Sequence, residues 1–493
     1  MESVWIALKE TCTVNVLFLA IAGSVLGMIW GAMPGVSTVM AMALLVGVTA
    51  KLSTYEAIMI LLTIMVSSVY GGSITAVLIN IPGKATAIPT AIEGYQLTLK
   101  GEGGLALGTT IMGSFIGNWI GIIAVILCVP LIMAIAMKFG SWEIFLLAFW
   151  GIAISGTLVG SEKPIKGWIS GWLGLLIASV GIEPIHGVAR FTFDMPALID
   201  GIGDVPVIIG LFGLAEVMKA LSSPSVTVSI KQVNRIIPKL SMLKEQFGTI
   251  IRSGFIGLII GALPAAGPNI ASFLSYITAK QRAKGEEREK FGKGSYTGLM
   301  AAEVADNACI GGDLLPTITL GIPGSAAMAI ILGSLNLHGI RVGPALETHH
   351  PGLIYFFYVA LILANFLMYG VALIIIKPGV KLFTMKKEIL MPLIAPLCAI
   401  GAFGINQSPF DLYVMLATGL LGLALYKMRY PIAPMILGVI LGPMADENLR
   451  KAIMIFQGQG ATLLDVLMRP VGTIMLVIIV LTFVQGLRQN RAG

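Results

Sequence analysis

Long apolar runs separated by short polar loops follow one another along the whole chain. Runs with the length and composition of membrane helices include residues 105–137, 144–158, 354–376, 389–403 and 471–484. About 20 apolar residues in a row are enough to cross a bilayer as a helix. The most polar stretches, 222–246 and 280–293, are too short to bury a core of their own. The pattern therefore predicts an all-α polytopic membrane protein without a soluble domain.

Proline and glycine interrupt the apolar pattern twice, in the same order. The first set is GAMPGVS at 31–37, YGGS at 70–73 and NIPGK at 80–84, and the second is GALPAAG at 261–267, GGD at 311–313 and GIPGS at 321–325. A helix broken at membrane depth exposes backbone N–H and C=O groups, which protein, water or a ligand must satisfy. Matching interruptions in two halves of a chain indicate the binding site of a transporter.

The matching order predicts two inverted-topology repeats, each with a re-entrant hairpin and a broken helix, that form transport and scaffold regions. We expect a first membrane repeat at 11–220, a cytoplasmic linker at 221–251, a second repeat at 252–453, and a C-terminal transmembrane helix with a cytoplasmic tail at 454–493. Chance self-similarity of apolar sequence is the alternative, and the conserved order of the features argues against it. The number of crossings near 431–465 stays open.

Basic residues alternate between predicted loops in a way that fits this topology. The predicted inner loops are the basic ones: 100–102, 161–166, 219–252, 280–293, 377–387, 426–430 and 488–491. The predicted outer loops are poor in Lys and Arg: 139–143, 183–204, 338–350 and 406–410. Cytoplasmic loops of membrane proteins are enriched in these residues. Corresponding loops of the two halves exchange their basic character, as repeats of opposite orientation require.

Composition narrows the function classes. Only 12% of the 493 residues are charged, against about 25% in soluble proteins. The net charge of +7 comes from short loops between apolar segments, so nucleic-acid binding is not supported. The sequence contains no GxxxxGK[ST] motif and no coherent catalytic set, so we expect neither ATP hydrolysis nor an enzyme. The N-terminus is interpreted as retained rather than as a signal peptide.

The helix ends created by the breaks are the predicted substrate site. The N-terminus of a half-helix offers free N–H groups and a positive dipole end that suit a carboxylate, whereas a C-terminus suits Na⁺ or a protonated group. Small polar residues at the breaks either bind the substrate or only bond to a neighbouring helix. The candidate substrate-binding residues are Pro34, Gly35, Ser37, Thr38, Asn80, Pro82, Gly83, Lys84, Thr86, Gly267, Asn269, Pro323, Gly324 and Ser325.

Lys84 directly follows the first Ile-Pro-Gly break. A cation at this depth is costly unless it is paired, so a substrate carboxylate is one expected partner. The alternatives are that Lys84 extends to the membrane interface or pairs with Glu93.

Acidic and amide residues precede the second break. Glu303, Asp306, Asn307 and Asp313 lie in an otherwise apolar span, which suggests cation coordination or a proton relay. Glu303 could instead mark a water-filled helix end. The ion-coupling candidates are Ser73, Asn80, Asp306, Asn307 and Asp313.

These motifs, with EGY at 93–95 and GVxRFTF at 187–193, resemble the large transmembrane subunit of the bacterial tripartite tricarboxylate transporters. The resemblance covers nearly the whole chain and implies a secondary transporter that imports carboxylates. It also implies a periplasmic solute-binding protein and a small transmembrane subunit as partners. Lys84 and Ala265-Ala266 depart from the residues expected at these positions. The identity of the carboxylate therefore stays open.

We therefore expect an ion-gradient-driven carboxylate importer in the bacterial inner membrane that works by an elevator-type movement. Na⁺ or H⁺ would be the coupling ion, with no cofactor and no resident metal. The alternative functions are the permease subunit of an ATP-driven importer and an anion channel.

Overall fold

The structure is a computed structural model that describes residues 2–33, 36–80, 83–158, 163–183, 185–222, 240–264, 267–379, 387–459 and 469–492. The described chain is helical apart from a two-stranded antiparallel sheet, β1 (Gly181–Ile182) with β2 (Ala189–Arg190). Within it, six helices are long and apolar enough to cross a membrane: Val14–Ala32, Thr54–Ile79, Gly103–Ala136, Leu353–Ile376, Pro409–Lys427 and Pro470–Arg488. The predicted all-α polytopic membrane protein is thus confirmed.

Helix α4 (Thr54–Ile79) lies at the centre of the first half of the chain. It begins with a capping box in which Ser53 and Glu56 satisfy each other's backbone N–H groups. Every residue from Ala57 to Ile79 is buried. Helix α2 (Val14–Ala32) packs along α4 at very short range. A Cβ atom on Gly31 would lie 2.2 Å from the Ser68 carbonyl oxygen, so this helix pair depends on glycine.

Helix α15 (Tyr296–Leu320) has the same central position in the second half. It packs against α6 (Gly103–Ala136), α12 (Phe247–Gly261) and α13 (Gly267–Arg282). Glycines again allow the close approach, since a Cβ on Gly257 would lie 2.3 Å from the Ala305 carbonyl oxygen and one on Gly117 would lie 2.5 Å from that of Val304. The long helix α18 (Leu353–Gly379) packs against both α4 and α6.

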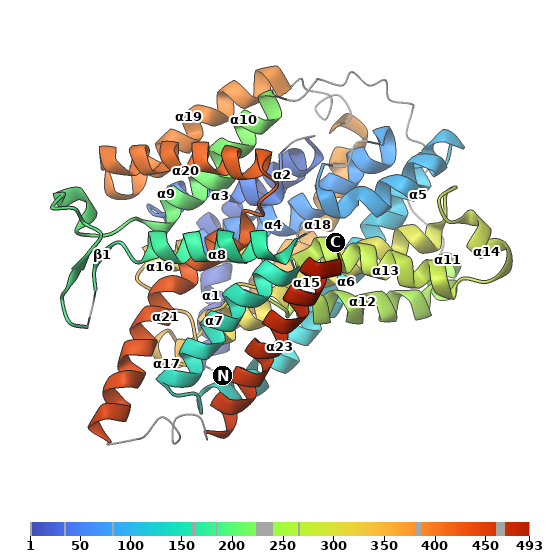
Figure 1. The fold of residues 1–493 in the computed structure, drawn as a ribbon. Coiled ribbons are helices and arrows are strands. Elements are labelled where there is room, and N and C mark those ends of the chain that lie inside the picture. The colour runs from blue at the N-terminus through green and yellow to red at the C-terminus, as the bar shows by residue number, and fades with distance from the viewer. Residues whose placement is uncertain are drawn as a thin grey trace.

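The remaining long helices form two further groups in Figure 1. One contains α7 (Ser141–Leu158), α8 (Pro164–Ala178), α21 (Ala433–Gly458) and α23 (Pro470–Ala492). The other contains α19 (Lys387–Asn406) and α20 (Pro409–Lys427), which pack on the continuous helix formed by α9 (Asp204–Ile208), the π-helical turn η3 (Ile209–Leu214) and α10 (Ala215–Leu221). The β1–β2 hairpin projects from the side of the molecule.

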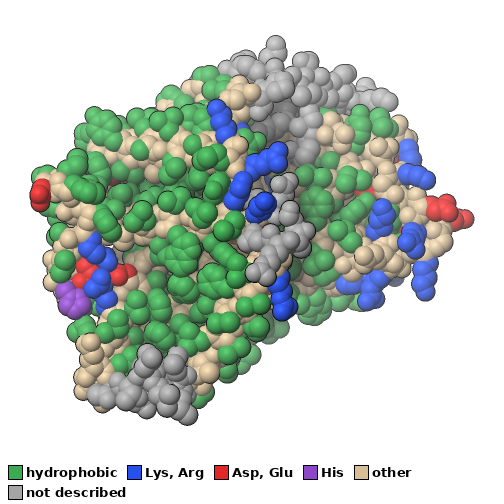
Figure 2. All heavy atoms as spheres, in the orientation of Figure 1, with side chains coloured by type: hydrophobic (Ala, Val, Ile, Leu, Met, Phe, Trp, Pro, Cys, Tyr) green, Lys and Arg blue, Asp and Glu red, His purple; other side chains and the backbone are tan. Residues whose placement is uncertain are grey.

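Shorter helices complete the described chain: α1 (Glu2–Thr11), α3 (Thr38–Thr49), η1 (Ala85–Ala87), α5 (Ile88–Leu99), η2 (Pro196–Leu198), α11 (Leu240–Glu245), α14 (Gly285–Lys290), α16 (Ala326–Leu337) and α17 (Leu346–His349). The surface agrees with a membrane environment. Hydrophobic side chains dominate the face in Figure 2, and Lys and Arg side chains gather at one end, over α13 and α14.

Candidate functional site

The first break places three glycines against one another. Helix α4 ends at Ile79, and Asn80 continues in the left-handed region with a φ of 57°. The chain then turns back along α4, so that the Gly83 N–H donates to the Gly72 carbonyl oxygen at 3.3 Å. A Cβ atom on Gly83 would lie 2.2 Å from the Gly31 carbonyl oxygen, at the end of α2. Only glycine permits this approach of the break to both helices.

The second break has a similar arrangement. Helix α15 ends at Leu320, and Gly321 has a φ of 69°. The chain turns back until Gly324 lies beside Asp313, where a Cβ atom on Gly324 would be 2.5 Å from the Asp313 Cα. The same Cβ would be 2.8 Å from the carbonyl oxygen of Gly261, at the end of α12. Each break therefore returns to the C-terminal third of its own helix and contacts the end of the preceding hairpin helix, α2 or α12.

Lys84 leaves the first break toward α15. The aliphatic part of its side chain covers Gly72, and its ammonium group forms an ion pair with the Asp306 carboxylate. The two side chains are only 8% and 2% exposed. Thr86 donates its hydroxyl to the same Asp306 oxygen, Oδ2, at 3.1 Å. The other oxygen, Oδ1, is buried without a hydrogen-bond partner among the described residues. The Asp306 carboxylate can therefore accept a further donor or a cation.

Glu303 lies near Asp306 on α15 and is held by hydroxyl groups. Ser73 and Thr90 each donate to Oε1 at 2.6 Å, and Ser114 donates to Oε2 at 2.9 Å. These donors come from α4, α5 and α6. The Asn307 amide donates in turn to Ser114 Oγ at 2.8 Å. A buried carboxylate is normally costly, and three hydroxyl donors compensate much of that cost.

Asp313 belongs to the second break. Its carboxylate accepts from the Cys309 thiol at 3.4 Å, and Ser325 of the second break lies beside it. Ser325 also caps α16 by accepting the Met328 N–H at 3.4 Å. The acidic cluster predicted from the sequence is therefore divided in space. Asp306 faces the first break and Asp313 faces the second, and α15 connects them.

The two halves are joined through the helices that follow the predicted hairpin turns. On α13, Ser272 donates its hydroxyl to the Thr86 carbonyl oxygen at 2.9 Å, beside the first break. On α3, Thr49 bonds to Ser334 of α16 at 2.9 Å, beyond the second break. Each of these helices thus contacts the segment that follows the break of the other half.

Other predicted substrate residues have more local surroundings. Ser37 caps α3 by accepting the Met40 N–H at 3.1 Å, and Thr38 bonds to Ser68 of α4 at 2.9 Å. Asn80 and Asn269 are exposed, and Gly267 begins α13 with a φ of 67°. Pro323 is buried within the second break. Pro34, Gly35 and Pro82 lie outside the described residues.

The two alternative positions considered for Lys84 are wrong. Its side chain is buried and does not extend to an interface, and it pairs with Asp306 rather than with Glu93. Helix α5 turns Glu93 toward the loop before α15, where the carboxylate accepts the N–H groups of Gly294 and Ser295 at 3.0 and 2.8 Å. It also accepts the Tyr276 hydroxyl at 2.6 Å. Glu93 therefore binds its own set of donors.

Sequence reasoning missed Thr90 and Ser114, the hydroxyl donors to Glu303 from α5 and α6. It also missed the buried amide pair in which Asn118 of α6 donates to Asn365 of α18 at 3.0 Å. The available signal was that each of these residues interrupts an apolar helix. The sequence does not show which other helix they face.

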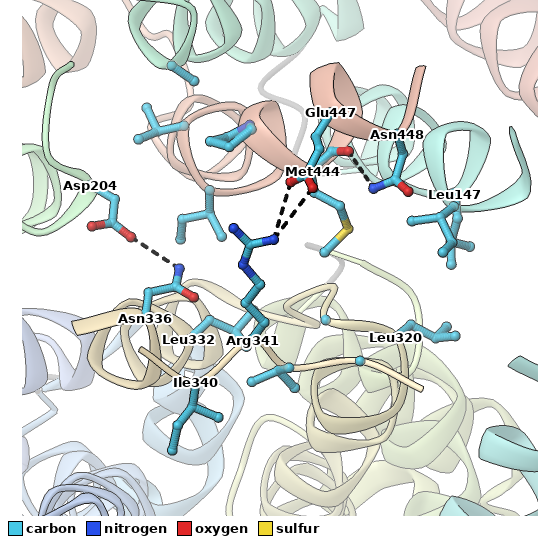
Figure 3. Close-up of a pocket in the computed structure, with 18 of the residues that line it drawn as sticks. Leu147, Asp204, Leu320, Leu332, Asn336, Ile340, Arg341, Met444, Glu447 and Asn448 are labelled. Carbon is cyan, nitrogen blue, oxygen red and sulfur yellow. Dashed lines mark hydrogen bonds and ion pairs between the residues drawn. The ribbon is translucent and has the colours of Figure 1, made fainter. Parts of the chain in front are cut away.

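A cavity of about 560 Å³ lies beyond the second break, as Figure 3 shows. Its walls are mainly apolar and come from α7, α16, α21 and the segment 339–344, with Gly321 at one side. Two long polar contacts cross it. Asn336 of α16 donates to Asp204 at 3.5 Å, and Arg341 lies 3.5 Å from Glu447 of α21. The cavity lies beside the second break, whose Ile322 packs directly against Leu147 of α7 and Leu441 of α21.

Apolar spans around two broken helices with buried charges define a multi-pass membrane transport protein, and comparison with known proteins agrees. Residues 17–437 match the family described as "Tripartite tricarboxylate transporter TctA family". The chain belongs to this family, which provides the large membrane subunit of tripartite tricarboxylate transporters. The predicted resemblance is thus confirmed, and the protein is a transport protein rather than an enzyme.

Two relatives from Agrobacterium vitis are similar to the chain. One is described as an uncharacterized 52.8 kDa protein in the TAR-I ttuC' 3' region and is 35% identical over 447 residues, or 90% of this chain and 88% of its own length. The other, described as an uncharacterized protein in the TAR-II ttuC' 3' region, is 36% identical over 202 residues, or 41% of this chain and 83% of its own length. No solved structure was found to match the chain.

Proposed function

We propose that the protein imports a di- or tricarboxylate by secondary transport, driven by a gradient of Na⁺ or H⁺. The observation that carries this proposal is the buried ammonium of Lys84 directly after a broken helix. A substrate carboxylate that takes the place of Asp306 would find a cation and the N-terminal end of the segment leading into α5. A fixed cation beside free backbone N–H groups suits an anion with several carboxylates.

The substrate site would lie between two inverted-topology repeats. The first comprises the predicted re-entrant hairpin α2–α3 and the broken helix α4–α5, and the second comprises α12–α13 and α15–α16. Support comes from the matching glycines: Gly31, Gly72 and Gly83 in one half, and Gly261, Gly312 and Gly324 in the other. The repeat boundaries 11–220 and 252–453, with the linker 221–251 and the C-terminal segment 454–493, remain part of this proposal.

The hairpins and broken helices would form a transport unit that moves against a scaffold. Helices α6 and α18 belong with the moving unit, because Ser114 of α6 bonds to Glu303 and Asn365 of α18 bonds to Asn118. Some unbroken spans would therefore belong to the transport unit rather than to the scaffold. The cavity next to α21 lies beside this boundary, and its polar contacts of 3.5 Å would cost little to break. The apolar contacts of Ile322 with α7 and α21 would have to be exchanged during the movement.

Family membership implies a tripartite system, and we infer its other parts. A periplasmic solute-binding protein would deliver the carboxylate, and a small transmembrane subunit would complete the complex in a bacterial inner membrane. The basic end formed by α13 and α14 would face the cytoplasm.

Uptake into proteoliposomes tests the proposal. The full chain with its small subunit is reconstituted, the binding protein is added or omitted, and radiolabelled di- and tricarboxylates are supplied under a Na⁺ or a pH gradient imposed separately. Saturable, gradient-dependent uptake supports the proposal. Uptake that requires ATP and no ion gradient would indicate the permease of an ATP-driven importer, and fast non-saturable flux would indicate a channel.

A further inference from the structure

Two buried oxygens on α15, one of them beside the first break, have no hydrogen-bond partner among the described residues. Asp306 Oδ2 accepts from Lys84 and Thr86, but Oδ1 has no hydrogen-bond partner within the described chain. The same is true of the Asn307 side-chain oxygen, although the Asn307 amide nitrogen has two acceptors. Both residues are at most 1% exposed. Unpartnered carboxylate and amide oxygens are the groups that bind a hard cation or a proton.

The Lys84–Asp306 pair is neutral only while no substrate carboxylate is bound. Lys84 and Asp306 then neutralise each other. One substrate carboxylate that binds Lys84 adds a negative charge, and Lys84 cannot neutralise two carboxylates. A buried carboxylate without a counterion is strongly unfavourable. One monovalent cation for each carboxylate held by Lys84 restores neutrality.

We propose that binding of the substrate carboxylate to Lys84 turns Asp306 into the binding site for one monovalent cation. This inference rests on the proposed function and adds the rule that couples the two solutes. The empty protein has no strong cation site because Lys84 occupies Asp306. The substrate removes this internal counterion from Asp306. The Asp306 carboxylate, with its unpartnered Oδ1 and the Thr86 hydroxyl beside Oδ2, then receives the external cation.

The neighbouring acidic groups do not change their partners in this exchange. Glu303 keeps three hydroxyl donors from other helices, and Asp313 keeps the Cys309 thiol and Ser325. Neither accepts a hydrogen bond from Lys84 in the structure. The charged and titratable groups around Asp306 are Lys84 from the break and Glu303, Cys309 and Asp313 from α15. Of these, only Lys84 is a cation.

The first test needs no substrate. Lys84→Met removes the internal counterion of Asp306. The melting temperature of the full-length variant should therefore rise as Na⁺ replaces choline at constant ionic strength. If the coupling ion is H⁺, the melting temperature should instead rise as the pH is lowered in the absence of Na⁺. The melting temperatures of wild type and of the matched control Lys84→Met/Asp306→Asn should change with Na⁺ and pH only by the small amount that all variants share. A Lys84→Met melting temperature that is as insensitive as that of the control overturns the proposal.

The second test measures the binding of citrate and of succinate to the full chain in detergent. It does not use Lys84→Met, so it remains available if that variant does not fold. Wild-type affinity should rise about tenfold for each tenfold increase in the coupling cation, below saturation. Separate Na⁺ and pH series identify that cation. Asp306→Asn should bind in cation-free buffer, more tightly than wild type, with less than a twofold response. Glu303→Gln should keep the wild-type response.

The outcomes separate the inference from the proposed function. If the affinity of wild type for citrate and succinate does not change with Na⁺ or with pH, the inference is overturned but the proposed function is not. An unchanged cation response in Asp306→Asn, or a lost response in Glu303→Gln, also overturns it, the latter by assigning the cation to Glu303. Absence of binding and uptake for the whole carboxylate panel, with the binding protein present, overturns the proposed function and the inference with it.

Discussion

Gly83 and Gly31 are in contact through their backbones at the first break. The break is held so tightly that a Cβ atom on Gly83 would lie 2.2 Å from the Gly31 carbonyl oxygen. The neighbour is backbone and not a flexible side chain, so it has little freedom to move away. A methyl group at this position must therefore displace the break from α2 and α4 together.

We expect Gly83→Ala to reduce carboxylate uptake strongly and to destabilise the protein by about 1–3 kcal/mol, as overpacking does. Gly370→Ala is the control, because a Cβ on Gly370 in α18 would meet no atom within 4 Å. Uptake and thermal unfolding of both variants provide the measurement. Wild-type transport by Gly83→Ala would show that the break is wider than the structure indicates.

Lys84→Ala should abolish most carboxylate uptake because it removes the cation at the break. It should also destabilise the empty protein by about 3–5 kcal/mol, since Asp306 then lacks its buried partner. Lys84→Ala/Asp306→Ala should recover much of this stability without recovering uptake. Binding assays and melting curves on the two variants separate the roles, and unchanged carboxylate binding by Lys84→Ala would remove Lys84 from the substrate site.

Glu93→Gln should weaken the attachment of the loop before α15. The Gln amide nitrogen would face backbone N–H groups, such as those of Gly294 and Ser295, that now donate to a carboxylate. Leaving buried donors unsatisfied costs about 1–3 kcal/mol. Glu216→Gln, which loses only a partly exposed pair with Lys219, should cost less than about 1 kcal/mol. Equal melting temperatures for the two variants would contradict this account.

A cross-link between α16 and α9, beside the cavity, should stop transport. Asn336→Cys on α16 and Asp204→Cys on α9 would carry neighbouring thiols, because the native side chains are 3.5 Å apart. After Cys12 and Cys128 are changed to Ser, a short bifunctional maleimide should block uptake and leave carboxylate binding intact. The single-cysteine variants treated in the same way are the controls. Continued uptake by a fully cross-linked protein would exclude movement between these two surfaces.

The β1–β2 hairpin should respond to acid through Glu183. Burial raises the pKa of this carboxyl, but the N–H groups of His186 and Ile185 outweigh that effect and hold the pKa below its usual value of 4.5. A lowered folded pKa stabilises the hairpin fully above the unfolded pKa, and this stabilisation is lost as pH falls through the folded pKa.

Hydrogen exchange of residues 181–190, corrected for intrinsic rates, should therefore be constant from pH 7 to about pH 5 and increase below about pH 4. Glu183→Gln should exchange faster at neutral pH and lose the acid response. Asp194→Asn, in the exposed part of the adjoining loop, is the control. An acid response that persists in Glu183→Gln would assign the effect to another group.

The sequence allowed the helices to be predicted, but not their contacts across the two halves. Apolar length located the described helices α6, α18 and α23, and proline and glycine located both breaks. Helical periodicity shows which residues share a face but not which distant helix that face meets. For this reason the partner of Lys84 was not predicted, since Asp306 lies 222 residues away in the chain.

The same limit explains the acidic cluster. Asp306 and Asp313 are close in sequence and were grouped as one set, yet each faces a different break. The two-stranded sheet near Glu183 was also not predicted, because its strands have two residues each and leave no alternating pattern.

Helix α15 contacts both breaks, the first through Asp306 and the second through Asp313. Because one continuous helix contacts both breaks, the distance between the two breaks is fixed. In the proposed mechanism, a solute bound at one break would therefore travel together with the other break. The binding compartment would then cross the bilayer as one piece instead of opening by independent bending of its two halves.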